Sequence, residues 1–191
     1  MKRILKFIPL IIILILVIVV VAGVWSGYNG TVDMRETVDS NESEVRNRLQ
    51  QRHDKMEQLI SAIEGLQDHA EDIYNRITEA RAAYAKAAAS GTSEDYIAAD
   101  ALETSVLFAF EDNPYITATQ GYLTYMDEVS AMENALAVAR RDYNEAVQKY
   151  NAAVRKFPRV LYIGIFGFEK ELPYWEVSEN AGEVPLGNFS D

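Results

Sequence analysis

An uninterrupted apolar segment near the N-terminus constrains this sequence more than any other feature. Residues 7–25 contain no charged side chain, and every residue from Ile11 to Val21 is isoleucine, leucine or valine. As a helix, this segment would extend about 28 Å at a rise of ~1.5 Å per residue, which matches the hydrocarbon core of a bilayer. Trp25 and Tyr28 follow, where amphipathic aromatic residues gather at a membrane–water interface. We therefore predict that residues 1–26 form a transmembrane anchor that contacts the lipid bilayer through residues 7–25.

The alternative interpretation of this segment is a cleaved signal peptide, whose apolar region is normally only ~7–15 residues long and ends in small residues. The run here is longer, and Val20 with Ala22 makes a poor cleavage site, so a retained anchor is favoured. Lys2, Arg3 and Lys6 precede the run, and basic flanking residues favour the cytoplasmic side. The prediction is a single-pass protein of the cell membrane, with a cytoplasmic N-terminus and the remaining domain outside.

The chain after the anchor has a helical pattern. Residues 27–30 contain two glycines and are expected to form a flexible hinge. From residue 31 to residue 158, apolar positions recur at steps of three and four, the period of amphipathic helices rather than of strands. A first long helix is predicted to run to Ala89, with a bend or break near Gly65 because glycine weakens a helix interior.

Turn and cap residues divide the remaining pattern into a second and a third helix. Gly91 suits the residue just past a helix end, and Thr92 with Asp95 resembles a capping box at the start of the second helix. Pro114 suits the first turn of a third helix, which is predicted to continue to Phe157. Short connections make neighbouring helices antiparallel. The predicted fold class is all-α: an N-terminal transmembrane helix followed by a long-helix antiparallel bundle at residues 31–158.

The C-terminal residues 159–191 have a different composition. Residues 160–168 are apolar and aromatic, with two glycines and no helical period, so we expect an irregular tail packed on the bundle. Phe166 and Phe168 are predicted to insert against the long helices and to lock the end of the bundle. In the alternative interpretation, this segment dips into the membrane or docks a partner.

Composition and charge exclude several function classes. The residues after the anchor include 15 basic and 29 acidic side chains, and no basic patch is evident, so nucleic-acid binding is not expected. Cysteine is absent. His53 and His69 are too far apart to share a helical face at close range, and a solvated helix face explains them better than a metal site. No nucleophile elbow, phosphate-binding loop or zinc-protease motif is present, so we predict no catalytic residues, no cofactor and no enzyme activity.

A repeated dipeptide marks the third predicted helix. Tyr143-Asn144 and Tyr150-Asn151 lie seven residues apart, nearly two helical turns, so the two tyrosines share one face. Functionally, the repeat would be a polar ladder that binds a peptide or another helix. Structurally, the tyrosine rings would fill the helix seam while the asparagines form hydrogen bonds across it and fix its register. The structural interpretation is favoured.

Several short motifs occur along the chain in an order that forms one pattern. They are Tyr28-Asn29, Arg52-His53-Asp54, Glu79-Ala80-Arg81-Ala82, Asn113-Pro114, the run from Ala139 to Asn144, Val147, Tyr150-Asn151, Phe157-Pro158 and Phe166-Gly167-Phe168. Together these motifs resemble the LemA family of bacterial and archaeal proteins, which have an N-terminal membrane helix and an α-helical bundle. The similarity covers nearly the whole chain. One departure is the segment 55–59, where members usually have a proline.

The resemblance implies a fold and a membrane location rather than a reaction. The leading hypothesis is a non-enzymatic, membrane-anchored interaction or scaffold protein that presents long helical faces to an unknown protein partner. Association with further copies of the chain is one form that such an interaction takes. The alternative is an accessory subunit of a membrane enzyme such as a protease, because family members are often encoded near one.

Overall fold

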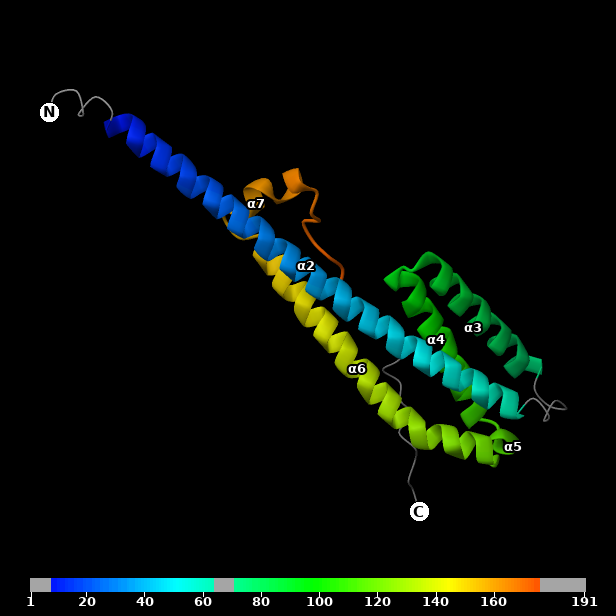
Figure 1. The fold of residues 1–191 in the computed structure, drawn as a ribbon. Helices are drawn as coiled ribbons and strands as arrows, with labels where there is room; N and C mark the ends of the chain where they lie inside the picture. The colour runs from blue at the N-terminus through cyan, green and yellow to red at the C-terminus, as the bar shows by residue number, and fades with distance from the viewer. Residues whose placement is uncertain (1–7, 64–70, 176–191) are drawn as a thin grey trace, which may run out of the picture. The chain divides into compact units, whose positions relative to one another are not determined.

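The structure is a computed structural model that describes residues 8–63 and 71–175 (Figure 1). All regular secondary structure in these two ranges is helical, which confirms the predicted all-α class. The elements in chain order are α2 (Ile8–Ile63), α3 (Glu71–Ser90), α4 (Ser93–Glu111), α5 (Pro114–Thr117), α6 (Gln120–Val154), α7 (Arg159–Tyr162) and the 3-10 helix η2 (Ile163–Phe166).

Helix α2 is continuous from the apolar segment into the acidic region, so the hinge predicted at residues 27–30 is wrong. Its glycines provide space for a neighbouring segment instead of a break. A Cβ atom at Gly27 would lie 1.9 Å from the Tyr162 hydroxyl oxygen, and one at Gly30 would lie 2.9 Å from an Arg159 guanidinium nitrogen. Because glycine lacks that atom, α7 packs closely against α2 while the helix stays intact.

The chain forms two compact units, and α2 and α6 each contribute to both. The first unit comprises Met1–Asn41 with Asp142–Tyr174, and the second comprises Glu42–Arg141 with Trp175–Asp191. In the first unit, the end of α6 lies beside α2. There the side-chain Nδ2 of Asn41 donates to the backbone carbonyl of Asp142 over 2.9 Å. The buried side chains of this unit are Thr31, Val38, Tyr143, Ala146, Val147, Tyr150, Asn151, Ala153, Val154, Tyr162, Ile163 and Leu172.

The second unit is built on antiparallel packing of α2 and α6, covered by the α3–α4 hairpin. Lys55 Nζ lies 2.7 Å from a Glu128 carboxylate oxygen, and Gly121 approaches Ala62. Residue numbers rise along α2 as they fall along α6, so the predicted antiparallel arrangement is confirmed for this pair. Its main core consists of Met56, Leu59, Ile60, Ile63, Ile73, Ile77, Ala80, Val106, Phe110, Ile116, Tyr122, Tyr125 and Val129.

Two predicted helix boundaries are confirmed by their caps. The Thr92 hydroxyl accepts from the Asp95 amide over 3.3 Å, directly after Gly91 with its positive φ of 66°. The Asn113 side chain accepts from the Tyr115 amide over 3.0 Å, and Pro114 occupies the first turn of α5. These side chains satisfy amide donors that a helix start otherwise leaves unpaired.

The long third helix predicted from Pro114 to Phe157 was partly wrong. The helix that starts at Pro114 ends after one turn, and α6 begins separately at Gln120 and ends at Val154. The break has a local cause, since the Thr119 hydroxyl accepts from the Tyr122 amide over 3.2 Å and so caps a new start. The first predicted helix is likewise two helices, α2 and α3. The break predicted near Gly65 lies outside the described residues.

The C-terminal segment contains two single helical turns, α7 and η2, followed by non-helical residues 167–175. Phe166 and Phe168 contact Tyr28 of α2 edge-on, with ring centroids 5.2 and 5.6 Å apart respectively. The prediction that Phe166 inserts against the long helices is wrong, because this side chain is 47% exposed. Phe168 is partly buried. Ile163 and Leu172 are the buried apolar anchors instead. The backbone of residues 169–173 lies against Tyr143, Tyr150 and Asn151 of α6. The remainder of the tail, residues 176–191, lies outside the described part.

Candidate functional site

The second unit contains a buried group of charges that we call the ion cluster. Its centre is Arg52, in the C-terminal part of α2, and this residue is only 5% exposed. Charged groups are rarely buried unless they are paired, so such a cluster is the first place to look for function. The cluster comprises Arg52 on α2, Asp100 and Glu103 on α4, and Glu133 and Arg140 on α6.

The Arg52 guanidinium contacts both of the other helices. Its Nη1 lies 2.8 Å from an Asp100 carboxylate oxygen and 3.0 Å from one of Glu133. Its Nη2 donates to the Asp100 carbonyl over 3.1 Å and to the Thr104 hydroxyl over 3.3 Å. Burial lowers the pKa of Arg52, but the nearby carboxylates of Asp100, Glu133 and Glu103 together outweigh it and raise that pKa. Arg52 is therefore a permanent cation that joins α2, α4 and α6.

The remaining charges complete the pairing around Arg52. Arg140 Nη2 lies 2.7 Å from the second Asp100 oxygen, so Asp100 is held between two guanidinium groups. Glu103 faces Arg52 Nε at 3.5 Å and His53 Nδ1 at 2.5 Å. The cluster thus has two arginines against three carboxylates, and the His53 ring lies beside one of these carboxylates.

His53 is held in place by an aromatic neighbour. Its ring stacks on Tyr84 of α3, with centroids 3.7 Å apart and planes only 2° from parallel. The Tyr84 hydroxyl donates to the Gln50 side chain over 2.6 Å. Burial, aided by Tyr96 and Glu103, raises the pKa of Tyr84, so this hydroxyl stays a neutral donor. The solvated helix face predicted for His53 is therefore wrong, because the ring is mostly covered and bonded to Glu103.

The chemistry of this arrangement is the pairing of opposite charges. Each carboxylate of the ion cluster is paired with a cation, and a carboxylate so paired is a poor general base. Among the residues that the structure describes, no group of three or more His, Asp or Glu side chains is arranged to hold a metal ion. His69 lies outside the described residues.

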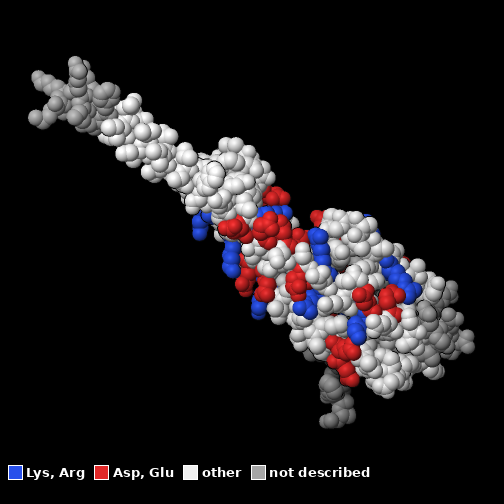
Figure 2. All heavy atoms as spheres, in the orientation of Figure 1, with Lys and Arg blue, Asp and Glu red and all other residues white. Residues whose placement is uncertain are grey.

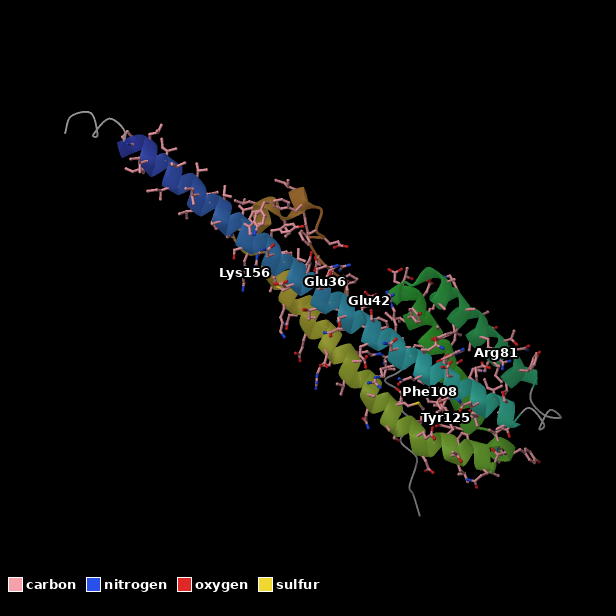
Figure 3. The ribbon with its side chains drawn as sticks, viewed as in Figure 1. Glu36, Glu42, Arg81, Phe108, Tyr125 and Lys156 are labelled. Atoms are coloured by element: carbon pink, nitrogen blue, oxygen red, sulfur yellow. The ribbon has the colours of Figure 1, made fainter. Side chains whose placement is uncertain are left out.

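A cleft of about 250 Å³ lies beside the ion cluster, between α2 and α6. Its lining includes Lys55 and Glu128, which form an ion pair, and Tyr125, whose ring is buried (Figure 3). The Tyr125 hydroxyl has no hydrogen-bond partner among the described residues. Burial raises the pKa of Tyr125 to about 12. The cleft is open and mixed in polarity, and it lacks the several convergent polar groups of a small-molecule site.

The Tyr-Asn repeat forms a second polar site, in the first unit. The Tyr143 hydroxyl donates to the Pro173 carbonyl over 3.1 Å, and the Tyr150 hydroxyl donates to the Glu169 carbonyl over 2.8 Å. Asn151 makes two bonds to the backbone of Leu172: its Nδ2 donates to the carbonyl over 2.9 Å, and its Oδ1 accepts from the amide over 2.8 Å. The repeat therefore holds an extended peptide, and that peptide is the chain's own segment 169–173.

Both interpretations of the repeat contained part of this result. Tyr143 and Tyr150 are buried in the seam, as the structural interpretation expected. Asn151 was predicted to bond across to another helix and instead bonds a non-helical backbone, because only such a backbone offers a free amide and carbonyl on one residue. The asparagine side chain matches that pair with one donor and one acceptor.

The ion cluster was missed by the sequence analysis, although a signal for it was present. Glu133 and Arg140 occupy positions of the apolar stripe of α6, where charged side chains are expected to be buried. Asp100 and Glu103 gave no such signal, since α4 is mostly apolar and its periodicity does not define one face. Arg52 entered the sequence analysis only as part of the family resemblance, and His53 entered it there and as a rejected metal ligand.

The fold and these sites define a class: an all-α bundle protein with one candidate membrane span in its described residues. That span lies in α2, whose most apolar window has a mean hydropathy of 3.0, and none of that window is buried against the rest of the protein. The LemA family model matches residues 41–189, and the chain belongs to the LemA family. This confirms the resemblance found in the sequence. No curated protein matches the chain.

Proposed function

We propose that this chain is a membrane-tethered interaction module: α2 anchors it in the cell membrane, and the helical bundle presents its faces to a protein partner without catalysing a reaction. The N-terminus is cytoplasmic and the bundle lies on the other side of the membrane. This orientation follows from Lys2, Arg3 and Lys6 ahead of the apolar segment.

The observation that carries the proposal is the continuity of α2. Its apolar segment has no covering from the described residues, while its later residues Thr31 and Val38 are buried in the first unit. A single helix without a flexible linker transmits the orientation of the anchor to the part of the first unit that packs against it. Such a stiff connection suits a protein that must hold a surface at a fixed position relative to the bilayer.

The distribution of charge supports the same function. The ion cluster places its charges inside the bundle, where they hold helices together and leave no unpaired carboxylate for catalysis. The outer face seen in Figure 2 carries both acidic and basic side chains, interspersed over the bundle. Interspersed charges of both signs favour recognition of a specific protein surface.

Site-specific photo-crosslinking of the full chain in native membranes tests the proposal. Reactive residues would replace Tyr74 on α3 and Tyr115 on α5, both exposed, and the buried Val106 would serve as the control. We expect a discrete protein adduct at one or both exposed sites and none at Val106. Identification of that adduct as a membrane protease would select the accessory-subunit alternative. The proposal is overturned if no exposed site captures a protein and the purified full chain turns over a substrate.

Topology is tested separately by thiol labelling, because the natural chain has no cysteine. A Tyr74→Cys variant in intact cells should react with a membrane-impermeant maleimide. A thiol that reacts only after the cells are opened would place the bundle in the cytoplasm and reverse the proposed orientation.

A further inference from the structure

A cluster of exposed apolar side chains lies in the first unit, at α7 and η2. Phe157 is 79% exposed, Leu161 67% and Ile165 81%. Val160 and Phe166 are also exposed in the same short stretch. The buried residues of this stretch, Tyr162 and Ile163, already fix it to the protein, so the exposed set is not needed to close the core. We call residues 157–166 the apolar foot.

The position of the apolar foot along α2 is defined by close contacts. Tyr162 lies against Gly27, Arg159 lies against Gly30, and the ring of Phe166 meets Tyr28 edge-on at 5.2 Å. These α2 residues are the first turn after Trp25, where the apolar segment ends. Figure 2 shows uncharged surface that continues from the anchor helix onto this part of the first unit.

Helix geometry then gives the depth of the apolar foot relative to a bilayer. With a rise of ~1.5 Å per residue, Gly27 lies about 3 Å and Gly30 about 7.5 Å beyond Trp25 along the helix axis. The headgroup layer on each side of the hydrocarbon core is roughly 5–8 Å thick. An anchor that ends at Trp25 therefore places the foot at the level of the headgroups, and any helix tilt brings it closer to the hydrocarbon.

The segment that contains the apolar foot has a net charge opposite to that of the rest of the domain. Residues 155–171 carry Arg155, Lys156, Arg159 and Lys170 against Glu169 and Glu171, in a chain whose post-anchor region is strongly acidic. Arg155 pairs with Glu171, while Lys156 and Lys170 are exposed (Lys156 is labelled in Figure 3). Apolar side chains bordered by basic ones are the pattern of a surface that enters an anionic membrane interface.

We propose that the apolar foot inserts into the headgroup–acyl boundary of the bilayer that α2 spans, as a second membrane contact beside the anchor. The inference rests on the proposed membrane tethering by α2. Its occupant is lipid, because the foot is fixed to the anchor helix at headgroup depth and carries the charge that anionic lipid attracts. Two contacts at separate points of one rigid unit would restrict tilt and rotation of α2 in the membrane.

Depth-dependent fluorescence quenching of the full chain tests this inference, and the cysteine-free sequence allows single labels. Ile165→Cys reports the foot, Val17→Cys reports the anchor and Tyr74→Cys on α3 is the aqueous control; all three native side chains are exposed. Each variant carries an environment-sensitive nitrobenzoxadiazole label in vesicles of phosphatidylcholine and phosphatidylglycerol. We expect a shallow doxyl lipid to quench the Ile165 label, a deep doxyl lipid to quench the Val17 label, and neither to quench the Tyr74 label.

The possible results separate the two proposals. Loss of quenching at Val17 as well as Ile165 would show that the tethering itself fails. Quenching at Val17 together with an unquenched, water-accessible Ile165 label would contradict insertion of the apolar foot and leave the tethering by α2 intact. An Ile165 label that is protected in native membranes but not in pure lipid vesicles would assign the surface to a protein and also overturn it. Adding Leu161→Glu, at an exposed position, should abolish quenching at Ile165 while quenching at Val17 persists.

Discussion

The two units stabilise buried polar groups in different ways. In the second unit, the ion cluster joins α2, α4 and α6, and three of its charged groups, Arg52, Asp100 and Glu103, are almost entirely removed from water. In the first unit, Tyr143, Tyr150 and Asn151 hold the segment 169–173 through neutral hydrogen bonds to its backbone. We expect removal of one charge to destabilise the whole ionic arrangement, because it leaves a buried partner unpaired. The neutral arrangement can release its segment and let water replace the lost bonds.

This difference shows which feature determines the packing of each unit. A buried charge without a partner is strongly destabilising. We therefore expect the ion cluster to favour the one packing of α2, α4 and α6 in which its charges are paired. Hydrogen bonds to a peptide backbone depend on where its amides and carbonyls lie and not on its side chains. Tyr143, Tyr150 and Asn151 therefore fix the register of the tail against α6. The second unit is therefore expected to be sensitive to single charge changes, and the first to changes in fit.

Removal of the central cation should have the largest effect. Arg52→Met removes the guanidinium that the buried Asp100 and Glu103 carboxylates share, and breaking a buried pair in this way costs about 3–5 kcal/mol. Urea unfolding of the full chain in detergent measures the loss. The control is Arg81→Met, which removes a partly exposed pair with Glu57 and should cost at most about 1 kcal/mol. Equal effects of the two variants would contradict the assigned role of the ion cluster.

The tail-holding site should respond less strongly. Asn151→Ala removes both bonds to Leu172, and the loss is limited to about 1–3 kcal/mol because the segment can detach and be hydrated. Detachment should appear as faster proteolysis within residues 168–175. Gln148→Ala, at an exposed position of the same helix, is the matched control and should leave proteolysis unchanged. A tail equally protected in the Asn151 variant would show that these bonds do not hold it.

Gly27 and Gly23 of α2 test whether close packing holds the first unit together. Gly27→Ala places a methyl group against Tyr162 and should disturb the packing of α7 at a cost of about 1–3 kcal/mol. Gly23→Ala meets no neighbouring atom within 4 Å and should be neutral or stabilise the helix by up to ~1 kcal/mol. Hydrogen exchange of residues 159–163 distinguishes them: exchange should speed up only in the Gly27 variant.

Alkaline pH should have the smallest effect, and it acts through the second unit. Burial raises the pKa of Tyr125 to about 12, so its neutral form stabilises the folded state below the ordinary tyrosine value of about 10. That stabilisation is lost as pH rises through the folded value and amounts to about 1 kcal/mol near pH 11. Tyr125→Phe should flatten the decline of unfolding free energy between pH ~10 and ~12. An unchanged slope would contradict the burial of this hydroxyl.

The sequence predicted features that local chemistry determines. The spacing of apolar residues at three and four positions predicted that the chain is helical. The helix starts near Thr92 and Pro114 were predictable because they depend on residues at the start of the helix itself. The hinge at residues 27–30 was wrong because glycine was interpreted locally, whereas its role depends on Tyr162, which is distant in sequence. The same reason hid the ion cluster, whose members lie on three helices. Tyr143 and Tyr150 were recognised as a pair, but nothing in the sequence identified the backbone that they bind.

Continuity of α2 from its apolar segment into the packed part of the first unit is the central claim, and a distance measurement across residues 27–30 tests it most directly. Spin labels at Val17→Cys and Ser40→Cys, both exposed positions of the first unit, would be measured by pulsed dipolar spectroscopy in lipid nanodiscs. An intact helix predicts one narrow distribution, with backbone positions about 35 Å apart. A broad distribution shifted to shorter distances would show a hinge and contradict the claim.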